Sequence, residues 1–439
     1  MHRSIPLLFR SVMYALRGGF LVRPLAIAVL LGLAGAGVSS LEEYIPSVAT
    51  WLPTILFPSR QDPQMAQVIL GSIAGSIMTV VSIVFAILLM TLTLASTQFS
   101  PRILVNFVRD RTTQWTLGLF LGTFSYCVAA LPAARSLPTP FAPVATVAGA
   151  MLLALLCVAW LIFFINHISQ SVSVNHIIDR IARETELVIN ELMPIQRTPF
   201  YQPTLPQVPA IEGEVAIVNE TSGYIRFVET GRLLTIARTH RLRIRLLRRV
   251  GHFVPAGIPL LMISRADRLT HDLIQALRSA VDIGPTRTLQ QNVELGVIQI
   301  VDIALRAISP AINDPSTAIS CIDQLSRILI RWIGRAPPLS HLHHPPHVLR
   351  VVLPWIDPSG LLDTAFDQIR HYGASDVAVS LRLLRAFDDI GSTVWEPYLR
   401  EMLRRRAQAV IESCEPHLPK GEMVRLRERL SSSFPAEQQ

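Results

Sequence analysis

The stretch MAQVILGSIAGSIMTVVSIVFAILLMTLTLA, Met65 to Ala95, decides the fold class, because it contains no charged side chain. A helix needs about 20 predominantly apolar residues to cross the hydrocarbon core of a bilayer. This stretch is longer than that, so we expect the helix to tilt or to protrude into water. The sequence therefore predicts a membrane-spanning helix here, and the other elements are placed around it.

Three further apolar runs are long enough to be spans: Phe20 to Leu41, Trp115 to Leu131 and Phe141 to Ile165. The chain of 439 residues is 50% hydrophobic, and its mean hydropathy of +0.40 is high for a soluble protein. We therefore predict a membrane α-helical region of four transmembrane helices over residues 1–165.

Arginines in the short loops alternate in number along the chain, which sets the expected orientation. The loops expected in the cytosol hold Arg3, Arg10, Arg17, Arg23, Arg102, Arg109 and Arg111, whereas the other two loops hold one arginine each. Both termini are therefore expected in the cytosol. An alternative treats the first run as a cleaved signal peptide with Ala34-Gly35-Ala36 as the cleavage site, which leaves the C-terminal part in the cytosol too.

The second run carries small and weakly polar side chains on one helical face: Gly71, Gly75, Thr79, Ser82, Ala86, Thr93 and Thr97. Such a face is interpreted as a helix-packing face, since small residues let helices approach closely in lipid, or as the lining of a pore. Gly118 and Gly122 in the third run have the same spacing. No ionisable residue lies in the middle of a run, which argues against proton-coupled transport but not against a channel.

The rest of the chain is predicted to be a cytosolic α+β part. Helical periodicity over residues 166–193 predicts a helix that extends from the fourth span, and a proline-rich linker follows at 194–210. Alternating patterns predict a small β-barrel or sandwich at 211–265. An α-helical domain is expected over 266–430, and a disordered tail over 431–439.

The densest basic feature lies in the predicted β domain and comprises Arg241, Arg243, Arg245, Arg248 and Arg249. It is interpreted either as a solvated or lipid-facing strand or as a candidate anion or lipid-headgroup site. The net charge is +8, and the basic residues are interleaved with apolar ones, so membrane lipids are expected as partners rather than nucleic acid. Lys420 is the only lysine, so a lysine-linked cofactor has no other anchor, and no cofactor is expected.

The segment VDIALRAISPAINDPSTA, residues 301–318, places Asp314 before Pro315, as in a helix that begins with a capping residue and proline. We interpret it as a structural helix-turn-helix in which Asp302 and Arg306, one turn apart, can pair. The alternative is a ligand or cation site, whose oxygen ligands would come from Asp302, Asn313, Asp314 and Asp323. No nucleophile and base lie beside these residues, so no catalytic residue is assigned.

A histidine cluster lies among prolines in what is predicted to be an irregular exposed loop: His341, His343, His344 and His347. Such tracts can hold transition metals, which is the functional interpretation here. The four cysteines form no CxxC pair, so neither a disulfide framework nor a zinc site is expected.

Several motifs together resemble a bacterial family of predicted membrane proteins, domain of unknown function 2254. They are TQFSPR (97–102), SGYI (222–225), ALRAISPAINDPSTA (304–318) and FDQIRHYG (366–373), with Arg287, Thr288, Gln291, Glu294 and Gly296. The chain departs from the family pattern at Ala311, where the family has Gly, and near Asn292, where it has Asp. The resemblance implies the bacterial inner (plasma) membrane and brings no activity with it.

Three classes of function remain. The first is a homo-oligomeric channel-like protein with a cytosolic regulatory domain, favoured by the small-residue face and by the absence of charge within the spans. The second is a membrane-anchored sensor or scaffold that binds a ligand, a lipid headgroup or a partner through its cytosolic domain. The third and least favoured is a membrane-bound enzyme that uses the region from Asp302 to Asp323.

Overall fold

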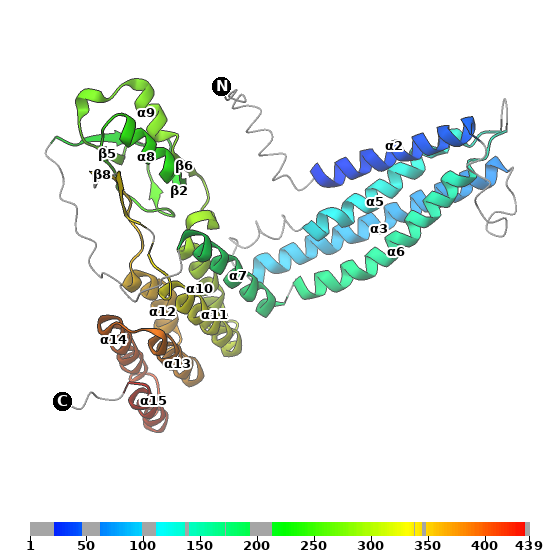
Figure 1. Ribbon diagram of the computed structural model, residues 1–439. Coiled ribbons are helices and arrows are strands. Elements are labelled where there is room, and N and C mark those ends of the chain that lie inside the picture. Colours follow the sequence, from blue (N-terminus) through cyan, green and yellow to red (C-terminus); the bar gives the residue numbers. More distant parts are fainter. Residues whose placement is uncertain are drawn as a thin grey trace. The chain divides into compact units, whose positions relative to one another are not determined.

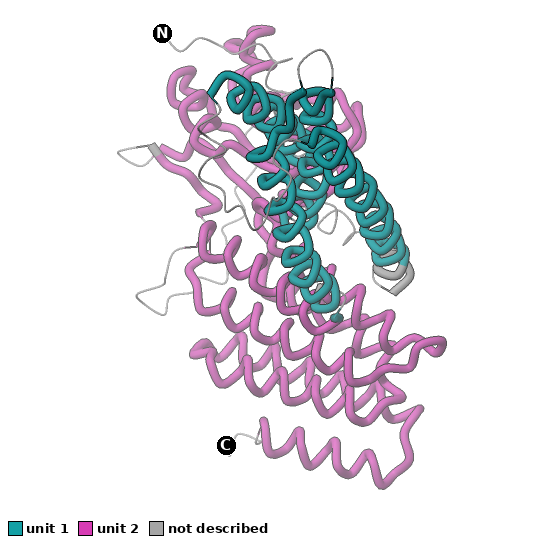
Figure 2. The backbone as a smooth tube through the Cα atoms, turned by 90° about the vertical axis from the view of Figure 1, so that its right-hand side faces the viewer, with its two compact units in different colours: residues 1–173 teal, residues 174–439 magenta. Residues whose placement is uncertain are grey.

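The computed structural model describes residues 22–45, 62–98, 111–136, 140–171, 173–193, 213–337, 339–344 and 348–434. The chain forms two compact units, Met1–Ser173 and Val174–Gln439 (Figure 2). The predicted linker at 194–210, the side chain of Thr97 and His347 lie outside the described residues.

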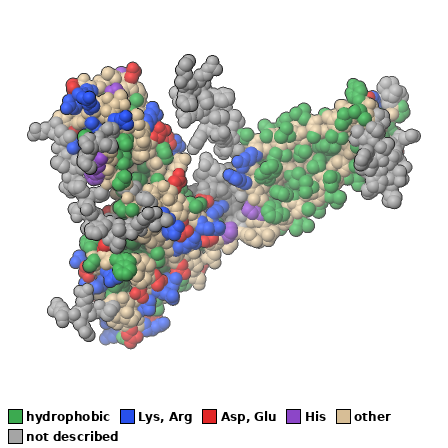
Figure 3. Space-filling view, viewed as in Figure 1, with side chains coloured by type: hydrophobic (Ala, Val, Ile, Leu, Met, Phe, Trp, Pro, Cys, Tyr) green, Lys and Arg blue, Asp and Glu red, His purple; other side chains and the backbone are tan. Residues whose placement is uncertain are grey.

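Unit 1 contains four helices that are long and apolar enough to cross a membrane: α2 (Val22–Tyr44), α3 (Pro63–Gln98), α5 (Arg111–Ala130) and α6 (Val144–Ser171). The four predicted spans are therefore confirmed as long apolar helices (Figure 1). Helix α3 has 36 residues. At ~1.5 Å per residue it is about 54 Å long, which exceeds a hydrocarbon core of ~30 Å. Hydrophobic side chains cover the surface of the four helices of unit 1, whereas charged side chains gather over unit 2 (Figure 3).

Helix α5 is the centre of unit 1, because it packs against α2, α3 and α6. Half of its apolar window is buried within the chain, against about a fifth in the other three helices. The contact with α2 depends on glycine: a Cβ on Gly118 would lie 2.6 Å from Cδ1 of Ile27, and a Cβ on Gly35 would lie 2.5 Å from the carbonyl oxygen of Tyr126. The glycines of the third span therefore pack helices closely, as small residues do in lipid.

The end of α2 carries a buried carboxylate, Glu42, which is 3% exposed. It accepts hydrogen bonds from the backbone N–H groups of Ala145 (2.9 Å) and Thr146 (3.2 Å) and from the Thr146 hydroxyl (3.2 Å). These N–H groups belong to the first turn of α6, where they have no partner within the helix. Glu42 thus caps a neighbouring helix, and the helix dipole favours its charge.

The single helix predicted over residues 166–193 is wrong in one respect, because the structure divides it. Helix α6 ends at Ser171, and α7 (Val174–Leu192) begins in the second unit. Ser173 is not helical, and its N–H donates to the carbonyl of Gln170 (3.1 Å). Serine competes with the helix for its backbone hydrogen bonds, which favours a break at this point. The apolar positions stay near helical spacing across the break, so periodicity alone did not reveal it.

The helical part of unit 2 comprises α7, α10 (Val293–Ala307), α11 (Pro315–Ile333), α12 (Pro358–Tyr372), α13 (Val377–Thr393), α14 (Pro397–Cys414) and α15 (Lys420–Ser433), and two further helices accompany the sheets. Helix α7 packs against α10 and α11. Arg327 of α11 donates to Glu186 (3.0 Å) and Asp179 (2.9 Å) of α7. Helix α15 continues through Ser433, so the predicted boundary between the helical domain and the tail, at residue 431, is too early in the chain.

Two sheets lie in unit 2. The five-stranded sheet has the order β1 (Val215–Val218), β5 (Pro259–Ile263), β3 (Ile244–Leu246), β8 (Val348–Val352), β7 (His341–His344). The three-stranded sheet has the order β4 (Phe253–Val254), β2 (Gly223–Val228), β6 (Val281–Gly284). Helices α8 (Thr230–Thr239) and α9 (His271–Arg278) accompany them, and one apolar core joins both sheets to these helices.

The sheet-containing part is confirmed, but the prediction of a small barrel or sandwich confined to 211–265 is wrong. The sheets do not close into a barrel, and three of their strands come from the region predicted to be helical. Strand β8 pairs in parallel with β3, with Ile244 opposite Val351. Such a pairing joins residues about a hundred positions apart, and no local pattern announces it. The predicted loop at the histidine cluster is also wrong, because residues 341–344 form β7.

Candidate functional sites

The small-residue face of α3 points away from the rest of unit 1. Gly71, Gly75, Thr79, Ser82, Ala86 and Thr93 are all exposed, and a Cβ on either glycine would meet no atom of the described residues within 4 Å. The opposite face of α3 is buried, with Leu70 and Val84 fully enclosed. The hydroxyls donate to carbonyls one turn earlier in α3, at 3.1 Å for Thr79, 3.0 Å for Ser82 and 2.9 Å for Thr93. The three described hydroxyls of this face are therefore satisfied within α3, and the face can contact another helix.

The five predicted arginines do not form one site. Arg243 donates to Glu214 at 3.0 Å, and Arg245 donates to the other oxygen of the same carboxylate. The Glu214 side chain is only 4% exposed, and those of Arg243 and Arg245 are 15% and 25% exposed. Arg241 is exposed and has a positive φ of 53°. The strand arginines are thus paired with a buried carboxylate and do not form an open anion site.

Arg248 and Arg249 lie in a different setting, in the connection from β3 to β4. Arg249 forms an ion pair with Glu294 (2.7 Å), and Arg248 donates to the carbonyl of Phe253 (3.1 Å). The guanidinium carbon of Arg287 lies 5.3 Å from the ring centre of Tyr224. In the sequence Arg287 belongs only to a family motif, and no spacing rule connects it to Arg248.

The residues proposed as a cation site have separate structural partners. Asp314 caps α11: its carboxylate accepts from the Thr317 N–H (3.1 Å) and the Thr317 hydroxyl (2.6 Å), which lower the pKa of Asp314. The predicted cap with proline at the first helical position is therefore confirmed. Asp323 pairs with Arg382, and Asn313 is exposed with a positive φ of 50°.

Asp302 is half-buried on α10. Within the described ranges, no group of three or more His, Cys, Asp or Glu side chains is placed to hold a metal ion. The four residues proposed as oxygen ligands therefore do not form a ligand set in this structure.

The histidines at 341, 343 and 344 lie on edge strand β7, which pairs with β8. The hydroxyl of Ser340 lies 2.9 Å from Nδ1 of His341. Burial, and to a smaller extent His343, lowers the pKa of His341, so its neutral form is favoured. His341 and His343 do not form a metal-binding group with any other ligand side chain that the structure describes, and the side chain of His344 lies outside that description.

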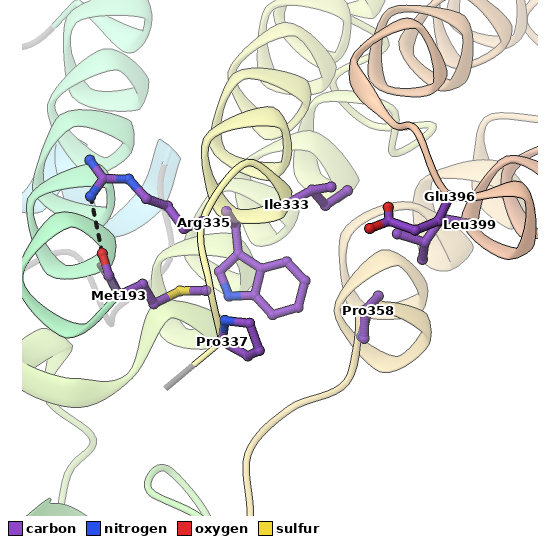
Figure 4. A pocket seen from close by; sticks show the side chains of 8 residues that line it. Met193, Ile333, Arg335, Pro337, Pro358, Glu396 and Leu399 are labelled. Carbon is purple, nitrogen blue, oxygen red and sulfur yellow. Dashed lines mark hydrogen bonds between the residues drawn. The ribbon is translucent and has the colours of Figure 1, made fainter. Parts of the chain in front are cut away.

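Unit 2 contains a largely apolar cavity of about 450 Å³. Its lining includes Val228, Leu246, Val250, Leu342 and Trp355. A second pocket, between Met193, Arg335, Pro358 and Glu396, has a volume of about 20 Å³ (Figure 4). That space suits a water molecule and no larger ligand, because one water needs ~10–15 Å³.

Four described helices are long and apolar enough to span a membrane, and an α+β unit follows them in the chain, as expected of a membrane protein. The chain belongs to the DUF2254 family of predicted membrane proteins, whose model matches residues 17–389. Uncharacterized proteins of Mycobacterium tuberculosis strain H37Rv and of Mycobacterium bovis are each 30% identical to it over 413 residues. Each alignment covers 92% of this chain and 78% of the relative. No solved structure matches the chain.

Proposed function

We propose that this protein is a homo-oligomeric, channel-like protein of the bacterial inner membrane, with unit 2 in the cytosol as its regulatory domain. The outward-facing small-residue face of α3 supports the proposal. A Cβ on Gly118 or Gly122 of α5 would overlap side chains of α2, whereas a Cβ on Gly71 or Gly75 of α3 would meet no described atom within 4 Å.

Helices associate in lipid by close van der Waals packing, which small side chains permit. A small-residue face that is not used within one copy is therefore available to a second copy. Where such faces surround a shared axis, rows of small and hydroxyl side chains can line a path for water and ions. The absence of charged residues from the middle of the predicted spans agrees with a passive path.

The arginine distribution supports the orientation. Arg3, Arg10, Arg17, Arg23, Arg102, Arg109 and Arg111 all fall on the side that we assign to the cytosol. Unit 2 follows the fourth span and is then cytosolic. The close packing of α2 against α5 supports a retained first span in place of a cleaved signal peptide.

Ion flux through liposomes that hold the purified protein tests this function. We expect flux in the natural protein and at least a tenfold loss in Thr79→Trp, because the indole would fill the shared face. The matched control is Ile87→Trp, on an exposed part of α3 outside that face. Absence of flux at every voltage, pH and osmotic gradient tried, or equal loss in both variants, would contradict the channel.

The cavity in unit 2 favours a second candidate function, a membrane-anchored sensor of small apolar ligands. Its volume lies in the range of ~300–1,000 Å³ that is usual for ligand sites, which are also mostly apolar. Ligands that bind only the folded state raise its thermal stability. A rise in Tm of the full-length protein with a particular apolar compound, without ion flux, would favour this function.

A further inference from the structure

Two connecting segments of unit 2 bring three guanidinium groups together against one carboxylate. Arg248 and Arg249 follow β3, and Arg287 follows β6. Only Arg249 has an acidic partner among the described residues, namely Glu294. Arg248 and Arg287 both lie beside the Tyr224 and Phe253 pair, whose ring centres are 5.2 Å apart. Like charges in such proximity repel unless an anion joins them.

The same accumulation of positive charge affects the pKa of His252. Burial, then Arg249, and then Arg287 and Arg248 lower the pKa of His252, whereas Glu294 opposes them. Three of the four charged neighbours are thus arginines. The imidazole is favoured in its neutral form, since a further positive charge is costly here.

The N-terminus of α10 lies against the same loop. Asn292 is 3% exposed, and its Oδ1 accepts from the N–H of Leu295 (3.2 Å). Its Nδ2 is buried and has no hydrogen-bond partner within the described part of the chain. Nδ2 is the atom nearest to the position that a Cβ on Gly251 would take, so this donor lies beside the segment that holds Arg249 and His252. The Thr288 hydroxyl, next to Arg287, is likewise buried without a partner.

From this geometry we propose that Arg248, Arg287 and Asn292 form a binding site for a phosphate group. Guanidinium groups match the geometry of phosphate oxygens, and the N-terminus of a 15-residue helix favours negative charge. A phosphate oxygen can also accept from a buried N–H group that is otherwise costly to leave unpaired. The proposed phosphate site contains no residue of α3, so it does not depend on the proposed channel. It excludes Arg243 and Arg245, because both already donate to the carboxylate of Glu214.

Two titrations of the full-length protein in neutral detergent separate the possible sources of the phosphate. The first uses inorganic pyrophosphate, and the second uses short-chain phosphatidylglycerol with short-chain phosphatidylcholine as the comparison. We expect saturable binding in at least one of the two titrations, and the affinity should fall as the salt concentration rises. Saturation by pyrophosphate assigns a soluble phosphate compound. Saturation by phosphatidylglycerol alone assigns a lipid headgroup.

Arg287→Gln should weaken binding of the compound that saturates the site at least tenfold. Arg248→Gln, as a separate variant, should have the same effect. Arg241→Gln removes the same charge outside the site and should change Kd less than twofold. A Tm within about 2 °C of the natural protein would show that each variant folds. Absence of saturable binding in both titrations, or equal weakening by Arg241→Gln, would overturn the site.

Discussion

Gly296→Ala is expected to destabilise unit 2 by about 3 kcal/mol, the upper part of the range for overpacking. A Cβ at this position would overlap the hydroxyl of Thr185, where α10 crosses α7. Thr185 is fully buried and donates to the carbonyl of Ile181 (2.7 Å) within its own helix. The two helices therefore have no space to receive a methyl group. Thermal unfolding of the full-length protein should show a Tm lower by roughly 6–12 °C.

The matched control is Gly231→Ala in α8, where an added Cβ would meet nothing within 4 Å. Alanine is preferred over glycine in helices by up to ~1 kcal/mol, so this variant should be neutral or slightly more stable. Thr185→Ala should restore most of the stability that Gly296→Ala loses, since it removes the overlapping hydroxyl. A normal Tm for Gly296→Ala would show that the close approach of α7 and α10 is wrong.

Glu214→Gln should destabilise the five-stranded sheet by ~3–5 kcal/mol, because it leaves two largely buried guanidinium groups without their carboxylate. Arg243 and Arg245 both donate to Glu214, which is almost fully buried. The corresponding fall in Tm is roughly 6–20 °C. Exposed pairs contribute only ~0–1 kcal/mol, so Glu220→Gln, which removes the exposed partner of Arg278, provides the control. Equal effects of the two substitutions would contradict a buried ion-pair centre.

The spans were predictable because apolarity over about twenty residues decides the structure without tertiary context. The Asp314 and Pro315 cap was also predictable, since it depends only on neighbouring residues, from Asp314 to Thr317. Strand β8 could not be predicted, because its pairing with β3 depends on residues about a hundred positions away. The histidine tract was misread for the same reason: its flanking prolines predicted a loop, and only the partner strand makes it part of a sheet.

The basic residues show which features of a site can be predicted from sequence patterns and which cannot. Alternation placed Arg243 and Arg245 on one face of a strand, but the single carboxylate of Glu214 that joins them precedes β1. Arg248 gained its neighbour Arg287 only through the pairing of β2 with β4 and β6. The periodicity of α3 identified a small-residue face. Which way that face points is a property of the packing of α5, and it could not be read from the helix alone.

Cysteine crosslinking at the α3 face most directly tests the proposed interface between copies of this chain. The natural cysteines at 127, 157, 321 and 414 are all buried, so an added cysteine can be followed in the natural background. Gly75→Cys in native membranes should oxidise to a disulfide-linked dimer. Ser76→Cys, one position on and ~100° around the helix, should stay monomeric. Dimers from Ser76→Cys alone, or from neither variant, would contradict an oligomer built on this face of α3.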